Sequence, residues 1–381
     1  MTATAWIARE RHLKVRVPPW YGSGAVLLPV AVFALLAWLA GRAGPPIAAE
    51  DATLDEGPVL LRALYTALGT AGARVLSAAA AAATIAATAL LGLRFWHSPA
   101  VGLLAGALVA VDPSLLAYGH TATPVTLVLA LGLLALVAFT SPRAWPRWIG
   151  AALLFLGAFI GPSLLLWSVP LLPFVLLRGH IYAAPKHLGL AVLQTLAAPA
   201  LGVLLAVLVA QGPPPGLPAC LRTSGVEGLL LATVPGLGAG RFAVPDPALW
   251  FGGLLTLAFL GGAAILHVVG RFRIQRLPGR LQLRLPQPLS RLQARSLWLL
   301  AFALFAPMPV FWLPLLALGI GAGIRALGED ARGFGGLIAV LVLGFALVYA
   351  VRLWGLVTGT ATPEEAGRLL SIVPWMGVQG C

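Results

Sequence analysis

The stretch GSGAVLLPVAVFALLAWLAG at residues 22–41 decides the class of fold, because it is uncharged and long enough to cross a bilayer as one helix. Similar apolar runs recur along the 381 residues, whose mean hydropathy is +0.94. Apolar residues make up 60% of the sequence and charged residues 10%, which excludes a soluble globular domain. The sequence therefore predicts a polytopic membrane protein, in which the lipid-embedded backbone must be helical.

The apolar runs predict an all-α fold with eleven membrane-spanning helices, and residues 1–354 form one transmembrane domain. Single spans are expected at 22–41, 74–93, 99–118, 124–139, 188–210, 249–269 and 334–352. Two longer runs are interrupted by prolines or glycine, and we interpret each as a helical hairpin because proline favours a break. They are 148–177, broken at Gly161-Pro162, and 296–326, broken at Pro307 and Pro309.

The distribution of basic residues predicts the orientation. An odd number of spans puts the two ends of the chain on opposite sides. With the N-terminus inside, most of the 25 basic residues fall in inner loops, including the arginine-rich segment 271–295. The short tail 355–381 then lies outside. The same pattern explains the formal charge of +13 without a nucleic-acid partner and indicates a multi-pass protein of the plasma (inner) membrane, with membrane lipids around it.

The first outer loop, residues 42–73, concentrates the rare negative charge of the chain. Four of the twelve carboxylates lie in it, namely Glu50, Asp51, Asp55 and Glu56. A carboxylate just outside the membrane can act as a general base or hold a divalent cation against a phosphate. The helix-prone stretch 57–68 follows at once, so Asp55 and Glu56 can equally be residues that favour a helix start. Residue chemistry leaves these alternatives open.

A second segment carries a resemblance to a known family. Residues 111–120 read VDPSLLAYGH and residues 121–126 read TATPVT. This segment and the acidic loop after the first span resemble the GT-C superfamily of integral membrane glycosyltransferases, nearest to the protein O-mannosyltransferase and aminoarabinose-transferase branch. The resemblance covers residues 1–354 as architecture and is most specific over 50–130. It implies transfer of a sugar from a polyprenyl-phosphate carrier to a lipid or protein acceptor on the outer face.

The resemblance also implies roles for individual residues. Asp55 would be the catalytic base, and Glu56 would assist it or hold a divalent cation. His120, Arg62 and Tyr118 would face the phosphate of the carrier. Two positions depart from the family pattern, because His120 stands where an arginine is usual and Val125 stands where a second acid is usual.

These departures favour an alternative function, a catalytically inactive GT-C-derived scaffold subunit that binds other membrane subunits. A transporter with broken helices around a central site ranks third, because the halves of the chain show no internal similarity. The residue spacing contains no metal-binding cluster of histidine and cysteine, so no cofactor is predicted beyond the cation that the acids could hold.

Asp112 is the remaining candidate, since it lies inside the predicted span 99–118. A carboxylate within a membrane span is by default a functional hypothesis. Its place directly before Pro113 favours a milder interpretation, a residue that breaks the helix and faces water.

Overall fold

The computed structural model is almost entirely helical over the residues that it describes. Those are 19–42, 59–141, 144–178, 185–210, 274–277, 280–283, 298, 299, 301, 302, 305, 311–330, 334–352 and 354. The longer helices are α2 (Pro19–Arg42), α4 (Val59–Trp96), α5 (Pro99–Ala110), α7 (Pro124–Phe139), α8 (Ala144–Ile160), α9 (Ser168–Arg178), α11 (Ala198–Ala210), α16 (Trp312–Asp330) and α17 (Phe334–Arg352). The shorter ones are α6 (Pro113–Gly119), the 3-10 helix η1 (Pro162–Trp167), α10 (Pro185–Val192) and the π-helix η2 (Leu193–Ala197).

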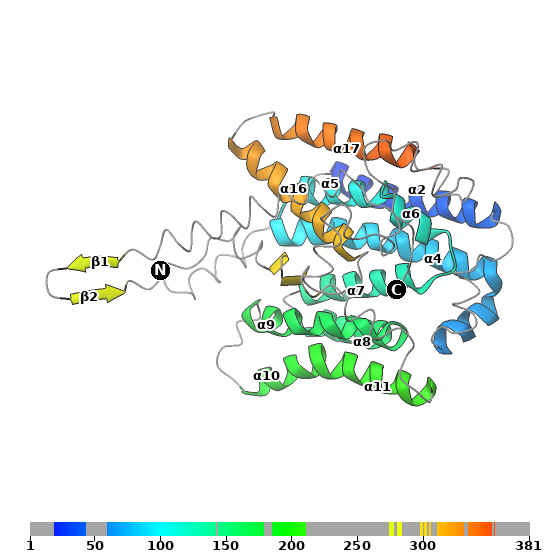
Figure 1. Cartoon of the computed structure of the whole chain (residues 1–381), viewed down its shortest axis with the longest axis horizontal. Helices are drawn as coiled ribbons and strands as arrows, with labels where there is room; N and C mark the ends of the chain where they lie inside the picture. Colours follow the sequence, from blue (N-terminus) through cyan, green and yellow to red (C-terminus); the bar gives the residue numbers. More distant parts are fainter. Residues whose placement is uncertain are drawn as a thin grey trace, which may run out of the picture.

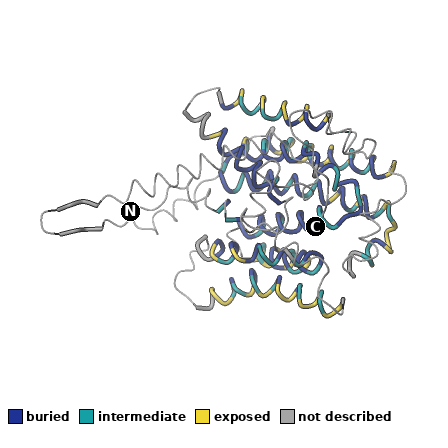
Figure 2. The backbone as a smooth tube through the Cα atoms, viewed as in Figure 1, coloured by how far each residue is buried: buried dark blue, intermediate teal, exposed yellow. Residues whose placement is uncertain are grey.

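Helix α4 is the centre of the body and packs against α2, α5 and α7. On one side the packing continues from α7 through α8 to α11, and on the other from α5 through α16 to α17 (Figure 1). Helices α11 and α17 therefore form the two outer edges, and both contain exposed residues (Figure 2). Many of these exposed residues are apolar. These include Leu201, Leu204 and Leu208 on α11 and Val340 and Leu341 on α17. Apolar faces of this kind suit helices that face lipid.

Within the described residues, three helices are long and apolar enough to cross a membrane, which supports the predicted membrane character. They are Tyr21–Arg42, Arg62–Trp96 and Leu188–Val209. Six further apolar helices are shorter, at 10–17 residues. The predicted span 249–269, the breaks at Pro307 and Pro309 and the tail 355–381 lie outside the described residues.

The predicted helix at 124–139 is confirmed at both ends, since α7 has the same bounds. The predicted span 99–118 is not one continuous helix, because it consists of α5 and α6 with a break before Pro113. Each of these two helices begins with a proline, preceded by a polar N-cap, Ser98 or Asp112. Proline at the first helical position and a capping oxygen before it start a new helix, which explains the division.

The predicted break at Gly161-Pro162 is confirmed, since α8 ends at Ile160 and η1 begins at Pro162. Helix α9, the second arm of the predicted hairpin, packs on η1, η2, α10 and α7. Helix α4 has a break of its own at Gly69, where φ is 67° and ψ is 173°. Only glycine adopts this conformation readily, so Gly69 separates the first turns of α4 from its long second part.

A two-stranded antiparallel hairpin is the exception to the helical architecture of the described residues. Strands β1 (Ile274–Leu277) and β2 (Arg280–Leu283) pair with Ile274 opposite Leu283. The hairpin lies within the arginine-rich segment that the sequence predicts as an inner loop and stands apart from the helices in Figure 1. The two residues between the strands, Pro278-Gly279, are typical turn formers.

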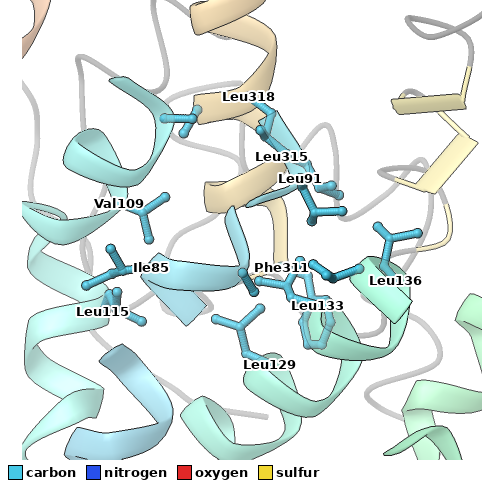
Figure 3. Close-up of a cluster of buried hydrophobic side chains, with 14 of the residues drawn as sticks. Ile85, Leu91, Val109, Leu115, Leu129, Leu133, Leu136, Phe311, Leu315 and Leu318 are labelled. Carbon is cyan, nitrogen blue, oxygen red and sulfur yellow. The ribbon is translucent and has the colours of Figure 1, made fainter. Parts of the chain in front are cut away.

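Buried leucines, Ile85 and Val109 from α4, α5, α6, α7 and α16 meet in the middle of the body, together with Phe311 just before α16 (Figure 3). Small residues let the central helices approach closely. A Cβ atom on Gly92 of α4 would collide with the backbone of Gly102 of α5, and one on Gly102 would collide with the carbonyl oxygen of Ala89. Close packing through small residues is what holds helices together when lipid surrounds them.

Candidate functional site

The turn between α6 and α7, residues 120–123, is held against α4 and α2. The Ser77 hydroxyl of α4 donates to the carbonyl oxygen of Thr123 over 3.4 Å. A Cβ atom on Gly119 would lie 2.6 Å from Leu36 of α2 and 3.1 Å from Ala81 of α4, so the end of α6 is pressed onto both helices. These contacts join segments that are far apart in the sequence, 46 residues in the case of Ser77 and Thr123, and they fix the turn at one end of the body.

His120 is the C-cap of α6 and is 8% exposed. Its Nδ1 lies 2.8 Å from the carbonyl oxygen of Leu116. A carbonyl oxygen only accepts, so Nδ1 carries the hydrogen in this bond. His120 therefore has the end-cap role that a histidine at a helix end often has, and its ring is oriented by that bond.

Tyr118 lies two residues before His120, in the last turn of α6, where it is half-buried and packs against the hydrophobic core. Arg62 lies in the first part of α4, before the break at Gly69, and is also half-buried. The structure thus places Tyr118 and His120 together at the end of α6. Arg62 lies in the part of α4 that precedes the break at Gly69. The helix predicted for 57–68 is present from Val59 onward.

Asp55 and Glu56, together with Glu50 and Asp51, lie outside the described residues, so their predicted roles stay predictions. They directly precede α4 in the sequence. Among the residues that the structure does describe, no group of three or more histidines, cysteines or carboxylates could hold a metal ion.

Asp112 is the N-cap of α6, and its carboxylate accepts from the backbone N–H of Leu115 over 2.9 Å. Its predicted role as a break residue is confirmed. The expectation that it faces water is wrong, because Asp112 is fully buried. A capping carboxylate is stabilised by the first N–H groups of its own helix, so it does not need water at that point.

Sequence reasoning missed the polar face that α4 turns toward this site. Arg74 is 5% exposed and Ser77 is 2% exposed, although both lie in a long apolar helix. Residues 74, 77, 78 and 81 fall on one face at helical spacing. The signal was present in the sequence, since Arg74 opens the predicted span 74–93, but it was interpreted as the end of a span rather than as a buried cation.

Arginines cap helix C-termini at the opposite end of the body. Arg94 in the last turn of α4 donates to the carbonyl oxygen of Val137 over 2.7 Å and to the hydroxyl of Thr140 over 3.1 Å. Arg325 of α16 donates to the carbonyl oxygen of Trp96 over 2.8 Å. The last carbonyls of a helix lack partners within the helix and carry partial negative charge, so a guanidinium there stabilises the end.

Arg147 of α8 belongs to the same end, since its Nε donates to the carbonyl oxygen of Ser141 over 3.3 Å, just after α7 ends. Because α7 begins at Pro124 and ends at Phe139, the turn 120–123 and these arginines lie at opposite ends of that helix. The body therefore has an arginine-capped end and a turn end that contains His120.

Comparison of the chain with protein-family models, curated proteins and solved structures found no match. The class that the fold defines is a helical protein with membrane-spanning character.

Proposed function

We propose that the chain is a multi-pass glycosyltransferase of the plasma (inner) membrane, with eleven spans and its N-terminus inside. It moves a sugar from a polyprenyl-phosphate carrier to a lipid or protein acceptor on the outer face. The observation that supports this most is the buried polar turn 120–123 at the end opposite the arginine-capped helix ends. Positive residues favour the inner side, so the turn would face the outer leaflet together with the acidic loop 42–73.

Each candidate residue has a role in the proposed reaction. The acceptor hydroxyl or amine attacks the anomeric carbon of the sugar, and the bond from that carbon to the carrier phosphate oxygen breaks. Asp55 takes the proton of the acceptor, and polyprenyl phosphate leaves. Glu56 assists or holds a divalent cation, while His120, Arg62 and Tyr118 face the carrier phosphate.

Replacement of Asp55 tests this proposal. Asp55→Asn keeps the size of the side chain and removes the base, so we expect transfer from a lipid-linked sugar to fall about a thousandfold in the purified full-length protein. Asp51→Asn is the matched control in the same loop and should retain transfer. Undiminished transfer by Asp55→Asn would exclude the assigned base.

A specific observation favours the scaffold alternative. Val125, at the position where the resembled family has a second acid, is half-buried and packs against the hydrophobic core. A scaffold should be isolated as a fixed assembly with other membrane subunits and without carrier lipid, whereas the enzyme should be isolated with polyprenyl lipid. Native mass spectrometry of a mild detergent extract separates these outcomes.

A further inference from the structure

One face of α2 is apolar and exposed along its length, and it ends in a tryptophan and an arginine. Leu27, Ala34 and Trp38 are exposed, and their spacing puts them on one face of the helix. Arg42 follows Trp38 by one turn and is also exposed. The opposite face contains the fully buried Leu36, and α2 packs against α4 and α5. The exposed stripe is therefore the side of α2 that is open to lipid.

The length of α2 places the two polar side chains at the surface of a bilayer. The segment Tyr21–Arg42 is long and apolar enough to cross a membrane. Its 22 residues rise roughly 33 Å, compared with about 30 Å for a hydrocarbon core. Arg42 is the last residue of α2, so it lies at the level of the lipid headgroups. Trp38 lies one turn deeper, at the boundary that amphipathic aromatic rings favour.

The guanidinium of Arg42 lies over its aromatic neighbour. Its Cζ is 4.3 Å from the centroid of the Trp38 ring, which is a cation–π contact. A guanidinium that stacks on a ring keeps its N–H donors available, because they lie in the plane of the group. Among the described residues, none accepts a hydrogen bond from Arg42. A Cβ atom on Gly41 would meet nothing within 4 Å, so the end of α2 is uncrowded.

Other arginines of the body are used by the fold. Arg94, Arg147 and Arg325 each donate to a backbone carbonyl oxygen. The last turn of a helix favours a cation, which explains an arginine at the end of α2 but not its place over an exposed tryptophan. Among the residues whose side chains the structure describes, Asp112 is the one carboxylate, and it is fully buried as the N-cap of α6. Arg42 therefore presents an unneutralised charge at the membrane surface of the described part of the chain.

The end of α2 belongs to the turn end of the body. A Cβ atom on Gly119, next to the turn 120–123, would lie 2.6 Å from Leu36 of α2. We infer that this end of α2 binds the headgroup phosphate of an anionic phospholipid in the adjoining leaflet. Arg42 would bind the phosphate through paired charge-assisted hydrogen bonds, and Trp38 would position the guanidinium. The acyl chains would lie along the exposed stripe of α2.

Charge complementarity selects an anionic phospholipid as the occupant. An arginine at a membrane surface attracts anionic headgroups, whereas a zwitterionic headgroup offers the same phosphate with a compensating positive charge. The inference does not depend on sugar transfer, because any multi-pass protein with this helix would have the same surface.

Native mass spectrometry of the full-length protein in detergent tests the site. The probes are phosphatidylglycerol and phosphatidylcholine with the same acyl chains. We expect Arg42→Gln to weaken phosphatidylglycerol binding about fivefold and phosphatidylcholine binding less. Arg42→Lys keeps the charge but loses the planar fork, so it should fall between wild type and Arg42→Gln. Arginines elsewhere in the chain also attract anionic lipid, so the comparison between variants reports on this site.

Arg94→Gln is the matched control, because it removes the same charge at the arginine-capped end. It should bind phosphatidylglycerol like the wild type. Trp38→Leu removes the ring and should weaken phosphatidylglycerol binding about threefold, while Trp38→Phe keeps a ring and should restore most of it. Trp38 and Arg42 are both exposed, so these variants should keep the fold.

Three results would overturn the inference. The first is equal phosphatidylglycerol binding by wild type and Arg42→Gln. The second is an equal loss of both lipids in Arg42→Gln, or an equal effect of Arg94→Gln, since neither is a charge effect at this site. The third is a polyprenyl monophosphate that binds more tightly than phosphatidylglycerol with the same dependence on Arg42, which would assign the surface to that lipid instead.

Discussion

The two ends of the helical body are held together by different kinds of side chain. At the capped end, Arg94 and Arg325 donate to helix C-terminal carbonyls, which attract a cation. At the turn end, the contact is made by a neutral group, since the Ser77 hydroxyl of α4 donates to the carbonyl oxygen of Thr123, the N-cap of α7. The arginine contacts at the capped end are explained by the fold alone, because the last carbonyls of a helix lack partners within the helix.

The largest effect is expected from a substitution that disrupts the packing of α5 on α4, in the part of the body between the two ends. Gly102→Leu would force α5 away from α4, because the added side chain collides with the Ala89 backbone. We expect a loss of about 3 kcal/mol in stability, measured as thermal unfolding in detergent. Gly344→Leu on the outer face of α17 is the control, since a Cβ atom there has nothing within 4 Å. Equal stability of both variants would contradict the close α4–α5 contact.

A smaller effect on stability is expected from a substitution at the arginine-capped end. Arg94→Gln removes the charge-assisted bonds to Val137 and Thr140, so we expect a loss of about 2 kcal/mol in stability. Sugar transfer should stay at the wild-type level, because the lost bonds are at the opposite end from the turn 120–123. A loss of transfer as large as that expected for Asp55→Asn would contradict a purely structural role for Arg94.

The smallest effect concerns Asp112, the buried acid at the turn end. Asp112→Ala removes the N-cap of α6 and should lower stability by about 1 kcal/mol in thermal unfolding. Asp112→Asn keeps a capping oxygen, so its cap should be retained. Sugar transfer should persist in both variants, because the structure gives Asp112 a helix-capping role. Loss of transfer in Asp112→Asn would instead make the carboxylate functional.

Local patterns in the sequence predicted much of the helical architecture. The bounds of α7 and the break at Gly161-Pro162 agree with the structure, because proline and apolar run length act on neighbouring residues. The run 99–118 was predicted as one span because its hydropathy is uninterrupted, although Asp112-Pro113 was interpreted as a helix break, and the structure shows that the break divides it into two helices. The hairpin β1–β2 was missed because charge alone predicted that segment to be a loop.

The candidate site was predictable only in part. Tyr118 and His120 came from a short local motif, and the structure places both at the end of α6. Arg74, Ser77 and Thr123 carry no shared motif, since Ser77 and Thr123 are 46 residues apart. Their proximity depends on how α4 packs against the turn after α6.

The sequence by itself determined an apolar, helical, arginine-rich chain and the points at which several helices begin and end, because hydropathy, proline and capping residues act over a few positions. Only the tertiary structure decided which polar or charged side chain contacts which helix end. It placed Ser77 of α4 against the turn before α7 and Arg94 on the end of the same helix, and both contacts depend on long-range packing through small residues.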